Sequence, residues 1–351
     1  MMHGLDELDR RLLTVLQRAV PLVRRPWDAM AEALGAAPAD VLARVQRLRS
    51  GPDALVRHIG AIFDARALGY SSTLVGARVP ADRLEQAAAV VALHPGVTHC
   101  YQREHQYNLW YTLAVPPDSI LGIERTVRIL HRRSGADLTL LFPALKVYKI
   151  GVAFDLTAPD GAASSPADAH NATSVAAPPD PDAACGPART FARVLQQDLP
   201  AVPAPFDVWA DQIGESVDSL LAAARMFLDR GIMRRFAAAL HHRRAGISAN
   251  CMVAWDVPAA QRDQFGRKAA SFPAVTHCYQ RPTYDDWPWS VFTMVHASSR
   301  PQCDAIIDRI AAETGITRCI RLYSTREFKK SRLFCFDGRI EAWEQQAAAC
   351  P

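Results

Sequence analysis

The sequence lacks several features that would assign it to a common functional class. Its eight cysteines form no CxxC pair, which argues against a zinc knuckle or a disulfide framework. It has no run of about 18 apolar residues that could cross a membrane, and charges interrupt its first helix-like segment, MMHGLDELDRRLLTVLQ. We find no phosphate-binding loop and no motif for pyridoxal phosphate, flavin or thiamine. We therefore expect a soluble cytoplasmic protein with reduced thiols and no organic cofactor of these kinds.

The bulk composition is that of a globular protein with a small excess of positive charge. The chain has 351 residues, 49% of them hydrophobic and 22% charged, and a formal net charge of +4. This length suits two domains, or two pairs of small ones, better than a single core. The charge suits an anionic ligand, but it falls short of the dense basic stripe of a strong nucleic-acid binder.

A duplicated heptapeptide shows that the chain is a tandem repeat. The segment VTHCYQR occurs at Val97–Arg103 and again, 178 residues later, at Val275–Arg281. The same offset carries Pro95 onto Pro273. Residues 157–188, between the two copies, are rich in Ala, Pro, Ser, Asp and Gly and lack the apolar side chains that would offset ordering entropy. We interpret them as a flexible linker between two versions of one module.

Each half predicts helices followed by a β-rich domain. Helical periodicity with a break at Gly35 indicates a helix-turn-helix in the first half, and Ile213-Gly214 marks the equivalent turn in the second. The order strand 71–79, helix 81–93, hairpin 97–103 and 107–115, helix 118–134 and strand 137–142 is βαββαβ, the ferredoxin-like arrangement, and residues 248–323 repeat it. The fold class is therefore α+β. The predicted domains are a helix-turn-helix (1–57), a ferredoxin-like domain (58–156), the linker (157–188), a second helix-turn-helix (189–235), a second ferredoxin-like domain (236–335) and a C-terminal helical tail (336–351).

This layout resembles a known family. The opening LDELDRRLLTVLQ, the helix-turn-helix and the βαββαβ unit resemble the Lrp/AsnC regulators. The segment HPGVTHCYQREHQYNLWYTL (94–113) resembles the signature of the siroheme decarboxylases, which share that architecture, and VTHCYQRPTYDDWPWSVFTM (275–294) and LYSTREFKKSR (322–332) resemble the partner subunit of that family. The resemblance implies a fused decarboxylase that converts two acetate side chains of siroheme to methyl groups, in heme d1 or alternative heme biosynthesis.

The repeated strand supplies the candidate site residues. Alternation along a strand is expected to place Val97, His99, Tyr101 and Arg103 on one face, and the corresponding four residues of the second copy likewise. Imidazole can ligate iron or transfer a proton, and arginine binds carboxylates through charge-assisted hydrogen bonds. We expect catalytic roles for His99, His105, His277 and Tyr101, with His99 or His277 as a possible axial ligand of the substrate iron. We expect substrate binding by Arg103, Tyr107, Asn108, Trp110, Tyr279, Arg281, Trp287, Trp289 and Arg326.

Each of these assignments has a structural alternative. The tryptophans are as well suited to a core as to a ligand platform, and the basic segment from Arg326 through Lys329 and Lys330 to Arg332 could be a solvated charge run. His105 has Thr283 at the equivalent position, so the site should be asymmetric. The default for the remaining histidines is surface or packing, and they are His58, His94, His131, His241, His242 and His296.

The expected partner is siroheme or a related iron tetrapyrrole, with no cofactor beyond that substrate. Homo-oligomers are expected, and further decarboxylase subunits are an open alternative as partners. A membrane partner is not expected. Two other functions remain open: an Lrp/AsnC-type transcription regulator, and a tetrapyrrole carrier without catalytic activity. DNA binding is disfavoured because the second recognition segment, SVDSLLAAARMFLDRG, balances Asp218 and Asp229 against Arg225 and Arg230. The first, PADVLARVQRLRSG, is more basic through Arg44, Arg47 and Arg49, so residual DNA binding stays an open alternative.

Overall fold

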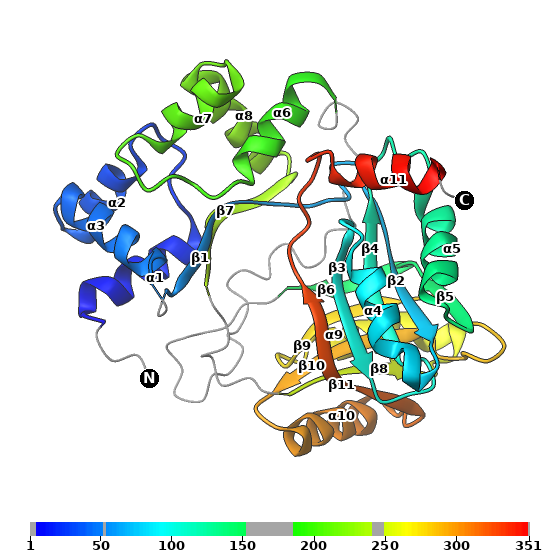
Figure 1. The fold of residues 1–351 in the computed structure, drawn as a ribbon. Coiled ribbons are helices and arrows are strands. Elements are labelled where there is room, and N and C mark those ends of the chain that lie inside the picture. The colour runs from blue at the N-terminus through cyan, green and yellow to red at the C-terminus, as the bar shows by residue number, and fades with distance from the viewer. Residues whose placement is uncertain (1–4, 52–53, 152–184, 241–248, 350–351) are drawn as a thin grey trace. The chain divides into compact units, whose positions relative to one another are not determined.

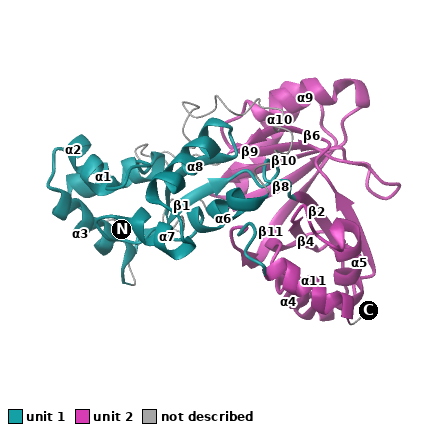
Figure 2. Ribbon diagram, turned by 90° about the horizontal axis from the view of Figure 1, so that it is seen from above, with its two compact units in different colours: residues 1–70, 176–244, 334–338 teal, residues 71–175, 245–333, 339–351 magenta. Residues whose placement is uncertain are grey.

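The computed structural model describes residues 5–51, 54–151, 185–240 and 249–349, and it divides into two compact units (Figure 2). Unit 1 comprises residues 1–70, 176–244 and 334–338, and unit 2 comprises residues 71–175, 245–333 and 339–351. Most of the predicted linker, and both His241 and His242, lie outside the described residues. Among the helices that are described, none is long and apolar enough to span a membrane.

Unit 1 contains the two predicted helix-turn-helix segments and a pair of strands. Glycines in the left-handed conformation end the second helix of each motif, Gly35 at φ 67° and Gly214 at φ 70°. The strands β1 (Val56–Phe63) and β7 (Met233–Leu240) pair antiparallel with each other. The predicted domain boundaries at 58 and 236 therefore fall inside strands that belong to unit 1. The helices are α1 (Glu7–Arg18), α2 (Pro26–Leu34), α3 (Pro38–Arg49), α6 (Gly186–Leu195), α7 (Pro205–Ile213) and α8 (Val217–Asp229).

Unit 2 is built on one continuous sheet, in which the described strands have the order β5-β2-β4-β3-β11-β8-β10-β9-β6 (Figure 1). The two ferredoxin-like domains are confirmed, each with its fourth, first, third and second strands side by side. The strands are β2 (Ser71–Arg78), β3 (Val97–Arg103), β4 (Leu109–Val115), β5 (Leu138–Phe142), β6 (Lys146–Ile150), β8 (Ala249–Trp255), β9 (Val275–Gln280), β10 (Val291–Ala297) and β11 (Cys319–Lys330). The helices are η1 (Ala81–Arg83), α4 (Leu84–Ala92), α5 (Gly122–Ser134), η5 (Ala259–Gln261), α9 (Arg262–Ala270), α10 (Arg300–Thr314) and α11 (Arg339–Ala349).

Two strands join the halves by exchange. The first-half strand β6 pairs with the second-half strand β9, at the far edge of the sheet. Strand β11 pairs with β8 over Cys319–Tyr323 and then continues over Ser324–Lys330 beside the first-half strand β3. The sequence predicted that this strand would end at Tyr323 and did not predict β6. Each half of the sheet is thus extended by a strand from the other half.

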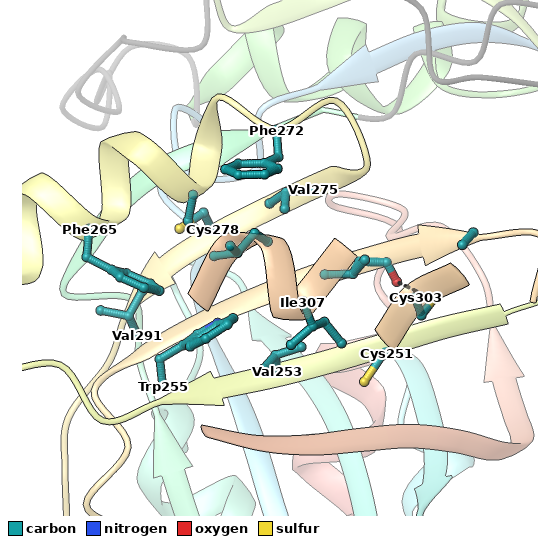
Figure 3. Packing of buried hydrophobic residues seen from close by; sticks show 14 of the residues in the cluster. Cys251, Val253, Trp255, Phe265, Phe272, Val275, Cys278, Val291, Cys303 and Ile307 are labelled. Atoms are coloured by element: carbon teal, nitrogen blue, oxygen red, sulfur yellow. Dashed lines mark hydrogen bonds between the residues drawn. The ribbon is translucent and has the colours of Figure 1, made fainter. Parts of the chain in front are cut away.

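Three buried clusters hold unit 2 together. Cys100 lies in the cluster under the first-half helices, and Cys278 in the cluster under α9 and α10, where Phe265 and Ile307 also pack (Figure 3). Both cysteines are packed thiols, and burial raises the pKa of each to about 12. The third cluster lies on the opposite sheet face and combines residues of both halves, including Trp110 and Trp287.

The C-terminal helix α11 belongs to unit 2 and contacts the first-half domain. The buried carboxylate of Glu344 accepts hydrogen bonds from the Ser119 hydroxyl and from the Ile120 amide, just before α5. The ring of Trp343 lies edge-to-face against His94, with 4.2 Å between ring centroids. The predicted helical tail therefore packs against the first-half ferredoxin-like domain.

Candidate active site

The duplicated strands β3 and β9 present two similar rows of histidine, tyrosine and arginine. The ring centroids of His99 and Tyr101 are 6.1 Å apart, and those of His277 and Tyr279 are also 6.1 Å apart. The Arg103 guanidinium lies 5.6 Å from the Tyr101 ring centroid. The two rows are thus built alike.

The prediction that the first valine of each copy shares this face is wrong. Val97 is buried with Cys100 under the first-half helices, and Val275 is buried with Cys278 in the equivalent second-half cluster. A register shift between Val97 and His99 in the pairing with β4 is the physical reason, because a bulge changes the alternation of side chains. An equivalent shift separates the partners of His277 and Val275.

His99 is held by a short hydroxyl relay. Its Nδ1 lies 3.0 Å from the Thr98 hydroxyl, which lies 2.8 Å from the hydroxyl of Thr112. Burial lowers the pKa of His99 to about 4, and the charge of Lys330 acts in the same direction. The imidazole is therefore neutral at physiological pH, with Nδ1 engaged by the Thr98 hydroxyl.

Tyr101 and Arg103 are the protonated members of the row. Burial raises the pKa of Tyr101 to about 12, and the carboxylate of Glu327 adds to that effect. Arg103 is 4% exposed and donates from one Nη to the Leu322 carbonyl at 2.7 Å. Burial lowers the Arg103 pKa to about 10, so it still carries its charge at pH 7. No carboxylate within the described part of the chain forms an ion pair with it, and its Nε has no hydrogen-bond partner there.

The second row has different neighbours. On β3, Lys330 of β11 is the register partner of His99, whereas on β9 the partner of His277 is Ile150 of β6. Arg281 donates to the Phe142 carbonyl and lies 4.7 Å from the Tyr279 ring centroid. The asymmetry that the sequence suggested at the hairpins is thus present along the strands too.

The structure places the hairpin aromatics in the core between the halves. Tyr107, Trp110 and Trp287 are each no more than 1% exposed and belong to the third cluster. The Tyr107 hydroxyl bonds to Asp286, and the ring of His105 packs edge-to-face on Trp287. These rings brace the two hairpins against each other and are not open platforms for a planar ligand.

Three further candidates have local structural partners. The Asn108 amide exchanges two hydrogen bonds with the backbone of Val79. The Arg318 guanidinium carbon lies over the Trp289 ring, 5.4 Å from its centroid. Arg326 pairs with Glu85 of α4, on the helix-covered face and away from His99. Register shifts in β11 around residues 325 and 328 send Arg326 to that face and return Lys330 to the face of His99.

The structure also brings forward a histidine that sequence comparison passed over. His296 on β10 lies on the same sheet face, and burial lowers its pKa to about 4, with Lys330 and Arg103 acting in the same direction. The first repeat has Ala114 at the corresponding position of β4, so matching the repeats could not mark His296. The useful signal would have been an ionisable side chain within the mostly apolar strand VFTMVHA.

We predict that His99 titrates near pH 4 rather than near its ordinary value. Burial opposes the charged imidazole, so the folded protein takes up this proton later than the unfolded chain on acidification. The contribution of His99 to the free energy of unfolding is therefore fully present above about pH 6.5, and it is lost as the pH falls through about 4. NMR titration of histidine-labelled protein measures this midpoint. The resonance missing from His99→Gln identifies the residue, and a midpoint near 6.5 would contradict the prediction.

Comparison with known proteins agrees with this architecture. A model for the AsnC-like ligand binding domain matches residues 67–149 and 244–329, and a model for the siroheme decarboxylase NirDL-like HTH domain matches residues 9–51 and 192–234. The siroheme decarboxylase of Hydrogenobacter thermophilus is 34% identical over 96% of this chain and 97% of that protein.

Two further matches are informative. A crystal structure of the siroheme decarboxylase NirDL in complex with an iron-uroporphyrin III analogue matches with a TM-score of 0.76 and 30% identity, over 98% of this chain and 99% of that one. The siroheme decarboxylase beta subunit of Methanosarcina barkeri is 40% identical over 40% of this chain and 91% of that protein. Because a full-length relative exceeds 30% identity and both kinds of domain match twice, this chain belongs to the siroheme decarboxylase family of carboxy-lyases, in the form that carries two modules in tandem.

Proposed function

We propose that the row on β3 binds siroheme and removes carbon dioxide from two of its acetate side chains. The observation that carries the proposal is the buried Arg103 cation, for which the described residues provide no carboxylate. A buried charge is costly unless it is paired, so a counter-ion supplied by the ligand would relieve that cost. An acetate of the tetrapyrrole has the charge and the geometry for an arginine.

The reaction needs an electron sink and a proton. The bond between the methylene and carboxylate carbons breaks, carbon dioxide leaves, and the electron pair remains on the methylene carbon, where the conjugated macrocycle delocalises it. One proton then forms the methyl group, so no oxidant or reductant is consumed. The Tyr101 phenol, with its raised pKa, holds a proton at neutral pH and lies on the same strand face.

The neutral imidazole of His99 has a different role in this proposal. With Nδ1 engaged by Thr98, its Nε2 is the nitrogen that can face a ligand, as an axial donor to the substrate iron or as a relay for the proton. Because the His99 pKa is about 4, the imidazole is not the charged acid. His277, whose register partner is Ile150 and not a lysine, is the candidate for the opposite axial position. Homo-oligomers or further subunits are compatible with these roles of His99 and His277.

A DNA-binding role is disfavoured by the state of the first recognition helix. Arg44 and Arg47 of α3 form ion pairs with Asp9, and Arg49 pairs with Asp198. These intramolecular carboxylates occupy the cations that would otherwise contact phosphates. The sequence-based expectation of weak DNA binding therefore gains a structural reason.

Anaerobic incubation of the purified protein with siroheme tests the proposal. We expect mass spectrometry of the extracted tetrapyrrole to show successive losses of carbon dioxide, ending at didecarboxysiroheme, the compound that would enter heme d1 or alternative heme biosynthesis. Tight binding with unchanged tetrapyrrole mass would identify a carrier and refute the decarboxylase proposal. An unrelated protein that does not act on siroheme, purified and incubated in the same way, serves as the blank.

A further inference from the structure

A polar row crosses four neighbouring strands next to the His99 site. His296 of β10 is the register partner of Asn250 of β8. The Asn250 side-chain oxygen accepts a 2.7 Å hydrogen bond from the Ser324 hydroxyl of β11. Ser324 is in turn the register partner of Arg103 on β3. Since register partners in an antiparallel pair share a face, these side chains form one line across the sheet.

The line lies on the sheet face that the helices leave uncovered. Its neighbours on β8 and β10, Cys251 and Val295, are buried under α9 and α10, so Asn250 and His296 point the other way. Lys330 lies beside His99 on the same face, and its charge acts on both His99 and His296. Glu327, the exposed register partner of Tyr101, brings a negative charge to this group.

Near His277 the arginine is repeated as Arg281, which donates to the Phe142 carbonyl as Arg103 does to that of Leu322, but the histidine, asparagine and lysine are not repeated. The strand pair β2–β4 has the same layout as β8–β10, with Ser72 opposite Ala114 where the second half has Asn250 opposite His296. Ile150 stands where Lys330 stands on the other side. The halves therefore share the row of histidine, tyrosine and arginine and the threonine beside each histidine, but they differ at the positions of His296, Asn250 and Lys330.

We propose that His296, Asn250 and Lys330, with Arg103, form an acetate-binding subsite that makes the His99 row the decarboxylating side of the protein. The inference rests on the proposed function and deepens it, because it says which carboxylate is held and by which half. Lys330 and Arg103 supply charge, and the neutral imidazole and the amide supply directed hydrogen bonds. The His277 row, flanked by isoleucine and alanine, would bind the macrocycle without holding an acetate.

Two iron porphyrins that differ only in whether they carry acetate side chains provide the test. Iron-uroporphyrin III carries acetates where iron-coproporphyrin III carries methyl groups, and both carry propionates. We expect Lys330→Met and His296→Ala each to weaken binding of iron-uroporphyrin III by about 10-fold or more, as for loss of a charge-assisted hydrogen bond, and to leave iron-coproporphyrin III binding unchanged. Absorbance titration at the Soret band measures both affinities without turnover.

Matched variants separate the subsite from general effects. Lys268→Met removes the same charge from α9, where Lys268 pairs with Glu313, and should change neither affinity. Lys330→Arg should retain tight binding of iron-uroporphyrin III. Equal weakening of both porphyrins by Lys330→Met, or no weakening, would overturn the inference. If the preference for acetates is lost in Lys330→Met but the wild type leaves siroheme unchanged, the subsite stands and the decarboxylase proposal fails.

Discussion

Replacement of Tyr101 by phenylalanine is expected to lower kcat by about 10²–10⁴-fold, the usual contribution of a positioned general acid. The phenol is protonated at neutral pH because burial and Glu327 raise its pKa to about 12. The carbanion left by departing carbon dioxide is a far stronger base, so the transfer is downhill once the two groups are in contact. Phenylalanine keeps the ring that packs against His99 and the Arg103 guanidinium, so binding should change little.

The duplicated strand supplies the matched control. Tyr279→Phe makes the same chemical change in a ring that stacks on His277 at the same 6.1 Å centroid distance. Because the proposed site is asymmetric, we expect Tyr279→Phe to keep most of the wild-type single-turnover rate. If the two variants lose the same rate, catalysis would be shared between the rows, and if Tyr101→Phe is as fast as the wild type, another group donates the proton.

Replacement of Arg103 by methionine is expected to separate binding from stability. Loss of one partner of a buried charge pair costs about 2–5 kcal/mol, so siroheme should bind about 30-fold to 4 × 10³-fold more weakly. The free energy of unfolding should stay the same or rise, because the free protein no longer buries a cation without a carboxylate partner. The lost hydrogen bond to the Leu322 carbonyl limits that gain to a small value.

Denaturant unfolding and Soret titration of the same preparation test this pair of effects. A large loss of stability with intact siroheme affinity would make Arg103 a structural residue that joins β3 to the strand carrying Leu322. Arg103→Lys is an informative companion, since it keeps the charge but not the forked donor geometry. We expect it to bind siroheme more weakly than the wild type and more tightly than the methionine variant.

The sequence predicts the repeated elements well because each is specified locally. The turns at Gly35 and Gly214 require the left-handed conformation that glycine adopts easily, and β2 and β4 are short apolar runs with β-branched or aromatic residues. Strand β6 and the second part of β11 are different. Their pairing partners, β9 and β3, lie in the other half of the chain, and no local pattern states which edge a strand will join.

The candidate site was predictable only where the two copies agree. Repetition of VTHCYQR marks His99 and Tyr101, but it cannot mark His296, because the other copy has alanine there. The bulges in β11 explain why Arg326 points to α4 while Lys330 points to His99, although four residues separate them. Alternation alone would assign these two side chains to one face, so only the pairing register decides which cation belongs to the site.

The exchange of β6 and β11 also has a consequence for assembly. Lys330 can stand opposite His99 only if a second-half strand lies beside a first-half strand. Separate subunits with this fold could equally pair with copies of themselves, and such pairs would bring two identical edges together. A covalent connection raises the effective concentration of the mixed partner and makes its pairing independent of expression level. Fusion thereby fixes the stoichiometry of the two unlike halves, so each could diverge while every chain still carried a complete site.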